Sequence, residues 1–256
     1  MKDIICEKIK EMEQLENIRV LHAVESGSRA WGFESPDSDF DVRFIYVRPK
    51  EFYLRLDKTR DVIEWQLDET LDINGWDLQK ALRLAHSSNP TIFEWKKSPI
   101  VYKTTPEWDC IKIEMLKYFS IKSGLHHYYN TAVNTYRTYF KGETVKLKKY
   151  FYVLLPLLAC KWILRKKTVP PVLFSELADT ELDEKIKPIV DNLVSLKMQI
   201  SELGESKHIV QLNEYIEQNL DGVKNEIDFL PTERKADWTG LNKLFLKILQ
   251  KIFKIV

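Results

Sequence analysis

Cysteine is scarce in this sequence of 256 residues, which has only Cys6, Cys110 and Cys160. The three are far apart, no Cys-x-x-Cys pair occurs, and none lies in a cluster with histidine. The pattern therefore indicates neither a structural zinc site nor a disulfide framework. A sparse, odd set of cysteines is typical of a reducing compartment, so we expect a cytoplasmic protein.

Excess charge of one sign and long hydrophobic runs are also lacking. The 39 Lys and Arg nearly balance the 38 Asp and Glu, leaving a net charge of +1. A protein this close to neutral has no overall field that attracts nucleic acid non-specifically. Residues 1–8 mix charges and contain no signal-peptide core. The longest apolar stretch, 150–164, contains Pro156 and Lys161 and is shorter than the ~20 residues of a spanning helix, so we expect no membrane partner.

The apolar content is sufficient for a folded core. Hydrophobic residues make up 44% of the chain and aromatic residues 12%, which excludes wholesale disorder. The spacing of apolar residues predicts strands over 19–25 and 39–47, and helices over 3–17, 76–85, 92–95, 107–122, 125–140, 144–166, 175–200, 208–226 and 238–255. Residues 61–73 alternate with period two and form either one bent strand or a tight hairpin.

The most informative segment is 26–43, SGSRAWGFESPDSDFDVR. Gly27 follows the first strand, and glycine lets the backbone adopt positive φ and approach a phosphate closely. The N–H groups of Ser28 and Arg29, at the start of a helical turn, are expected to point at an anion, and the Ser28 hydroxyl adds a donor. This loop is therefore a candidate site for a triphosphate.

Strand 39–47 brings the acidic residues of the same segment onto one face. Because side chains alternate along a strand, Asp39, Asp41 and Arg43 face away from the side that carries Phe40 and Val42. Two carboxylates ~7 Å apart on one face repel each other unless a cation lies nearby. Such a pair suits Mg²⁺, which takes one or two carboxylates together with water and substrate phosphates.

Gly27-Ser28 is separated by ten residues from the Asp-x-Asp motif at Asp39 and Asp41. The two motifs at this spacing resemble the signature of the DNA polymerase β-type nucleotidyltransferase superfamily. The fuller strings GSRAWGF, SPDSDFDVRFIYV, LDINGWDLQKALRL and SNPTIFEW are similar to the narrower family that contains the YcgL and RlaP proteins. The resemblance implies an α+β fold. A small mixed β-sheet nucleotidyltransferase domain with flanking helices would occupy 1–103, and an all-helical C-terminal domain would occupy 104–256.

The resemblance also implies a reaction, the transfer of an NMP from an NTP to a hydroxyl of a protein, an RNA end or a small molecule, with release of pyrophosphate. Asp39, Asp41 and a third carboxylate would be the catalytic residues and would bind two Mg²⁺ ions, for which Mn²⁺ can substitute. The NTP would bind in the cleft between the domains. The residues expected to hold it are Gly27, Ser28, Arg29, Ser38, Arg43 and a lysine from the helical half, Lys148 or Lys149.

The third carboxylate is predicted from the alternation in 61–73. Asp72 lies between apolar Leu71 and Ile73 and just before a break at Gly75, which favours a position near a strand end. Glu64 has the same parity and is the alternative. Asp68 and Glu69 are expected in a turn.

The sequence also allows other interpretations. The chain could be a nucleotide sensor or adaptor of the same fold without turnover, although the intact Asp-x-Asp disfavours this. The last helix, 238–255, has a stripe of lysines opposite apolar residues and could lie on a membrane, but packing of its apolar face into the core is favoured. His22 is interpreted as a packed strand residue rather than a base, and Asp77 as an acid in the first turn of a helix.

Overall fold

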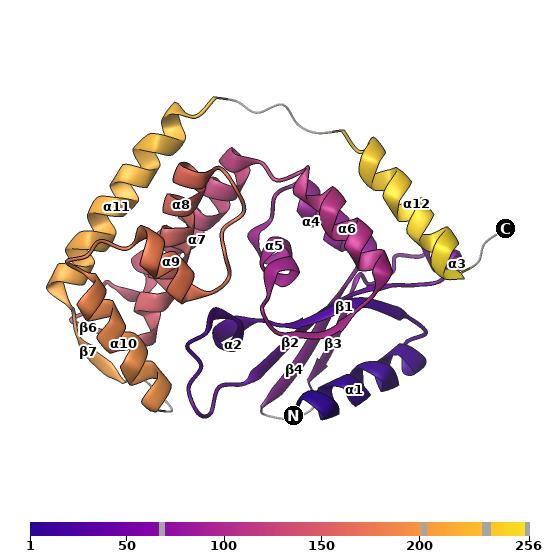
Figure 1. Cartoon of the computed structure of the whole chain (residues 1–256), viewed down its shortest axis with the longest axis horizontal. Coiled ribbons are helices and arrows are strands. Elements are labelled where there is room, and N and C mark those ends of the chain that lie inside the picture. Colours follow the sequence, from indigo (N-terminus) through magenta and orange to yellow (C-terminus); the bar gives the residue numbers. More distant parts are fainter. Residues whose placement is uncertain (67–69, 201–203, 232–236, 254–256) are drawn as a thin grey trace. The chain divides into compact units, whose positions relative to one another are not determined.

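A computed structural model describes residues 1–66, 70–200, 204–231 and 237–253. The chain divides into two compact units, drawn in Figure 1. The first unit comprises 1–30, 39–119 and 235–256, and the second comprises 31–38 and 120–234. Each unit draws on more than one stretch of chain, and the domain boundary expected at residue 103 stays a prediction.

The first unit contains a five-stranded mixed sheet. Its strands are β1 (Arg19–Glu25), β2 (Phe40–Val47), β3 (Val62–Gln66), β4 (Leu71–Asp77) and β5 (Val101–Thr104), in the order β3-β4-β2-β1-β5. Strands β2 and β4 are parallel, whereas the other neighbouring pairs are antiparallel. Together with the helices described below, this sheet confirms the expected α+β class.

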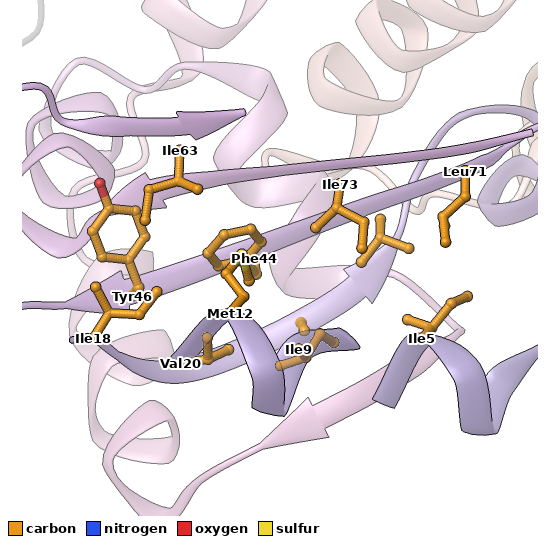
Figure 2. Packing of buried hydrophobic residues seen from close by; sticks show 12 residues of the cluster. Ile5, Ile9, Met12, Ile18, Val20, Phe44, Tyr46, Ile63, Leu71 and Ile73 are labelled. Atoms are coloured by element: carbon orange, nitrogen blue, oxygen red, sulfur yellow. The ribbon is translucent and has the colours of Figure 1, made fainter. Parts of the chain in front are cut away.

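Helix α1 (Lys2–Leu15) covers one face of this sheet. Figure 2 shows Ile5, Ile9 and Met12 of this helix against the strand residues Phe44 and Tyr46. The even-numbered side chains of β2 thus enter the core, as the alternation predicts, and the odd-numbered side chains face the other way.

The remaining helices of this unit are α2 (Gly27–Trp31, whose last residue belongs to the other unit), α3 (Lys50–Tyr53), α4 (Leu78–His86), α5 (Pro90–Lys97), α6 (Pro106–Leu116) and α12 (Thr239–Phe253). Helices α4 and α6 contact β2 and β1 on the face opposite α1 (Figure 1). Helix α12 packs on α6 and α4 and buries Leu241, Ile248 and Leu249, so these apolar residues pack into the core, as the favoured interpretation expects. Lys254, at the end of the lysine stripe, lies outside the described residues.

The second unit is predominantly helical. It contains α7 (Ile121–Tyr139), α8 (Lys148–Lys166), α9 (Phe174–Glu181), α10 (Lys187–Gln199) and α11 (Val210–Phe229), and a short ribbon of β6 (Thr144–Lys146) and β7 (Glu205–Lys207). Helices α7 and α8 pack along each other. None of the helices in the described part of the chain combines the length and the hydropathy needed to cross a bilayer.

The structure corrects several element boundaries in the helical half. The helix expected over 144–166 begins at Lys148, because 144–146 pair with β7. The helix expected over 175–200 is interrupted after Glu181, where the carbonyl of Asp183 accepts the N–H groups of Ile186 and Lys187 and a new helix begins.

Of the two alternatives for 61–73, the structure shows a hairpin, because β3 and β4 pair antiparallel. Gly75 does not break this segment: it lies inside β4, and a Cβ there would stand 2.1 Å from the ring of Phe44 on β2. Glycine at this position makes room for that ring. Strand β4 therefore continues to Asp77, and the helix expected from Trp76 begins at Leu78.

Candidate active site

The carboxylates of Asp41 and Asp72 lie across from each other on neighbouring strands. Asp41 is the second residue of β2 and Asp72 the second residue of β4, and the parallel register pairs them directly. Asp72 thus lies near the beginning of its strand, not near the end that a break at Gly75 implied. The structure brings together two of the three acidic residues that the sequence singles out for metal binding.

Arg43 connects these two carboxylates. Its Nη2 donates to Oδ1 of Asp41 and to Oδ2 of Asp72, both at 2.8 Å. Its Nη1 donates to the carbonyl oxygens of Val42 at 3.1 Å and Asp72 at 3.2 Å. Of the two roles that its place on the acidic face allows, phosphate contact or pairing with a carboxylate, the structure shows the pairing.

The glycine turn lies directly against the Asp41 carboxylate. Gly27 has φ +62°, in the left-handed region, and a Cβ built there would be 2.2 Å from Oδ2 of Asp41. A side chain at position 27 would therefore collide with the carboxylate. The Gly-Ser and Asp-x-Asp motifs, which are fourteen residues apart from Gly27 to Asp41 in the sequence, meet at this contact.

Three further predicted residues, Asp39, Arg29 and Ser28, lie in the segments that make this contact. Asp39 is exposed and immediately precedes β2, and its carbonyl oxygen accepts a hydrogen bond from Nε of Arg29 at 3.1 Å. The guanidinium of Arg29 also lies 3.8 Å from the ring centroid of Phe40. Ser28 follows Gly27 in α2. The predicted phosphate-binding residues of the first unit are thus placed at one end of β2.

Negative charge is crowded around Asp41. Burial raises the pKa of Asp41 above its usual value, and the charges of Asp72 and Asp39 raise it further, while Arg43 acts in the opposite direction. A cation bound there would relieve this repulsion. Among the described residues, no three His, Cys, Asp or Glu side chains are grouped closely enough to hold a metal on their own. Mg²⁺ does not need such a cage, because it accepts one or two carboxylates together with water and phosphate oxygens, so this donor set fits it.

Sequence reasoning missed one acidic residue of this region, Glu25 at the end of β1. It is 1% exposed. Its Oε1 accepts the backbone N–H of Asp41 at 2.7 Å, and its Oε2 accepts the hydroxyl of Tyr102. Burial raises the pKa of Glu25. The sequence carries no distinguishing signal for Glu25, since a carboxylate at the end of a strand is common.

Ser38 and Lys148 belong to the second unit. The Ser38 hydroxyl accepts the N–H of Ser35 at 2.8 Å and lies 2.9 Å from the Ser35 hydroxyl, so it closes a turn. Lys148 begins α8, and the ammonium group of the neighbouring Lys149 lies 3.6 Å from the ring centroid of Tyr139. The proposed nucleotide contacts of Ser38 and Lys148 stay predictions.

The other candidate residues that the structure describes, Glu64 and His22, make contacts away from the Asp41 carboxylate. Glu64, the alternative to Asp72, is exposed and paired with Arg60 at 2.8 Å. His22 is buried and stacks on Trp108 with ring centroids 4.5 Å apart, which agrees with a packed strand residue. Asp68 and Glu69 lie outside the described residues.

Asp77 is the N-cap of α4 rather than a residue of its first turn. Its Oδ1 accepts the N–H of Gln79 at 2.7 Å, and its Oδ2 accepts the hydroxyl of Tyr53 at 2.8 Å. This capping arrangement satisfies an N–H group at the start of the helix that would otherwise be unpaired.

Comparison with known proteins gives consistent results over nearly the whole chain. The family model described as "RlaP: RNA repair pathway DNA polymerase beta family" matches residues 1–247. The protein YcgL of Bacillus subtilis (strain 168) is 40% identical over 258 residues, covering 99% of this chain and 98% of that protein. A crystal structure of a nucleotidyltransferase-like protein from Exiguobacterium sibiricum 255-15 aligns over 96% of this chain and 80% of that chain, at 13% identity and a TM-score of 0.33. The extent of the family match and the level of identity show that this chain belongs to the RNA repair pathway DNA polymerase beta family.

Proposed function

We propose that this protein is a divalent-metal-dependent nucleotidyltransferase that moves an NMP from an NTP to a hydroxyl acceptor on a protein, an RNA end or a small molecule. In this reaction the acceptor oxygen forms a bond to the α-phosphorus, the bond between the α-phosphorus and its bridging oxygen breaks, and pyrophosphate leaves. Membership of a DNA polymerase beta family supports this class of reaction. The observation that carries the proposal is the meeting of Asp41 with both Asp72 and the Gly27 turn.

The residues take roles that follow from their positions. Asp39, Asp41 and Asp72 would hold Mg²⁺ or Mn²⁺, and Asp72 would help to take the proton from the attacking hydroxyl. Bound there, the cations would supply electrostatic stabilisation of the charge on the entering and leaving oxygens.

The triphosphate needs hydrogen-bond donors and positive charge. In the first unit, the Gly27 turn, with the Ser28 hydroxyl and the Arg29 and Arg43 guanidinium groups, would supply them.

The test is incubation with Mg²⁺ and each α-labelled NTP, followed by measurement of pyrophosphate and of label on added acceptors. We expect release of pyrophosphate by the wild type and a loss of at least about 100-fold in Asp41→Asn, since removal of one group that stabilises transition-state charge has an effect of this size. Asp57→Asn is the matched control, because Asp57 is an exposed carboxylate of the same unit that pairs with Arg55. Equal activity of Asp41→Asn and the wild type would refute the proposal.

One observation favours a second candidate, a nucleotide sensor without turnover. Arg43 already pairs with both Asp41 and Asp72, as it would in a protein that no longer needs a cation between them. Calorimetry of Mg·NTP binding together with the pyrophosphate assay distinguishes the two candidates. A sensor binds Mg·NTP without releasing pyrophosphate, whereas a transferase binds Mg·NTP and releases pyrophosphate.

A further inference from the structure

Both backbone polar groups of Asp41 are held by the two residues that precede Gly27. The N–H of Asp41 donates to Oε1 of Glu25 at 2.7 Å, and its carbonyl oxygen accepts the N–H of Ser26 at 2.9 Å. In the β1–β2 ladder Glu25 stands opposite Val42, so Asp41 lies one residue beyond the paired region. The Glu25 side chain continues the ladder where the backbone of β1 turns away.

Glu25 itself is fixed on every polar atom. Its N–H donates to the carbonyl oxygen of Ile100 at 2.9 Å, and its own carbonyl oxygen accepts the hydroxyl of Ser98 at 2.6 Å. Its second carboxylate oxygen accepts the hydroxyl of Tyr102 on β5. The backbone of Glu25 is thus held by Ser98 and Ile100, and its carboxylate by Asp41 on β2 and Tyr102 on β5.

A buried carboxylate opposes folding unless it is fully hydrogen-bonded, and an apolar residue at the end of β1 would avoid that cost. The peptide that it holds belongs to a residue with little freedom, because the Asp41 carboxylate lies against Gly27 and also accepts from Arg43. A small rotation of the Asp41 peptide would move the carboxylate away from both.

We infer that Glu25, clamped by Tyr102, is a positioning residue that holds the Asp41 peptide so that the Asp41 carboxylate faces the Gly27 turn and a divalent cation. The inference rests on the proposed function for the identity of the cation. Groups that orient a metal ligand through a hydrogen bond typically change metal affinity 10–100-fold when they are removed.

Three variants separate geometry from charge. Glu25→Gln keeps an oxygen for the Asp41 N–H and an amide that can donate to the Tyr102 hydroxyl, but it has no charge. Glu25→Ala removes both hydrogen bonds. Tyr102→Phe keeps the charge and removes the clamp.

The chain also offers a matched control in Glu13 of α1. Its Oε1 accepts the N–H of Val20 on β1 at 2.8 Å and its Oε2 accepts Nζ of Lys103 at 2.6 Å. It is thus another largely buried carboxylate that holds a strand N–H and a β5 side chain, but at the other end of β1. Glu13→Ala should lower the stability to urea as Glu25→Ala does, without an effect on the cation.

The measurement is Mn²⁺ affinity by electron paramagnetic resonance, with urea titrations alongside. We expect Glu25→Ala to bind Mn²⁺ 10–100-fold more weakly than the wild type, Tyr102→Phe to be intermediate, and Glu25→Gln and Glu13→Ala to stay within about threefold of the wild type. Wild-type affinity in Glu25→Ala would overturn the inference. A loss in Glu25→Gln as large as in Glu25→Ala would also overturn it, because charge rather than geometry would then be responsible.

A second readout keeps this inference distinct from the proposed function. If the wild type binds no Mn²⁺, the proposed function fails, and hydrogen exchange of the Asp41 amide decides the positioning role alone. Fast exchange in Glu25→Ala with slow exchange in Glu25→Gln supports the role, whereas equal exchange in the wild type and Glu25→Ala overturns it.

Discussion

Replacement of Gly27 by alanine combines two costs that can be worked from the structure. At φ +62° a residue with a Cβ pays about 1–2 kcal/mol relative to glycine. The new Cβ would also stand 2.2 Å from Oδ2 of Asp41, so the carboxylate must move by about 1 Å to reach ordinary contact. That movement weakens the charged hydrogen bond between Asp41 and Arg43. A buried hydrogen bond of this kind contributes about 1.5–3 kcal/mol, and this one contributes less because Asp41 is partly exposed. We expect Gly27→Ala to lower the free energy of unfolding by about 2–4 kcal/mol.

The control is the same substitution at Gly222, an exposed position inside α11 where a Cβ meets no atom within 4 Å. Alanine in an exposed helix interior is favoured over glycine, so Gly222→Ala should stabilise its unit by about 0.5–1 kcal/mol. Urea titration with hydrogen-exchange mass spectrometry reads the two units separately. Mg·ATP affinity is measured by calorimetry in parallel and should fall at least about tenfold in Gly27→Ala, corresponding to about 1.4 kcal/mol.

Two outcomes would refute this reasoning. If Gly27→Ala is as stable as the wild type, neither the backbone strain nor the collision with Asp41 exists. If it is destabilised as expected but binds Mg·ATP with wild-type affinity, the turn is structural and does not belong to a nucleotide site.

Three further predictions test the packing around the sheet. Burial lowers the pKa of His22 from 6.5 to about 4, so the unfolded chain takes up the proton first as the pH falls. Relative to His22→Phe, the wild type should lose about 3 kcal/mol of stability between pH 7 and pH 4, and a pH-independent difference in urea titrations would contradict this. Burial raises the pKa of Asp77 from 3.8 to about 6, so here the folded state takes up the proton first. Relative to Asp77→Asn, the wild type should gain about 2 kcal/mol over the same pH range, and a loss would show that the Asp77 carboxyl is not buried as described. Gly75→Ala should cost about 1–3 kcal/mol by overpacking against Phe44, and Phe44→Leu should relieve part of this cost in a double-mutant cycle, whereas additive effects would rule out the contact.

The sequence predicts those parts of the fold that depend on local alternation. The period-two pattern of 39–47 places β2 and its faces correctly, since the side-chain direction in a strand follows from the pleat. The short strand β5 was missed, because four residues that include Lys103 and Thr104 show no marked pattern. The sequence predicts a break at Gly75 because a glycine inside a strand usually weakens it, and only the position of the Phe44 ring explains the glycine within β4.

The residues of the site also differ in how far the sequence predicts them. Gly27 and the Asp39–Asp41 pair could be recognised from spacing, because both motifs lie on adjacent segments of chain. Glu25 could not be recognised, since its role depends on two hydrogen bonds, one of which comes from Tyr102, 77 residues later in the sequence. A carboxylate at a strand end is ordinary in a sequence, and only its burial and its partners distinguish it.

The register of β2 against β4 links these observations. Asp41 pairs with Asp72, and because successive side chains alternate, a shift of one residue would place Leu71 or Ile73 opposite Asp41. The core specifies the register strongly, since the same shift would turn Ile73 from the α1 side of the sheet to the acidic side. The apolar residues that pack against α1 therefore fix the meeting of the carboxylates on the other face. Substitutions in that core that leave the fold intact but loosen the register should impair the site before they unfold the protein.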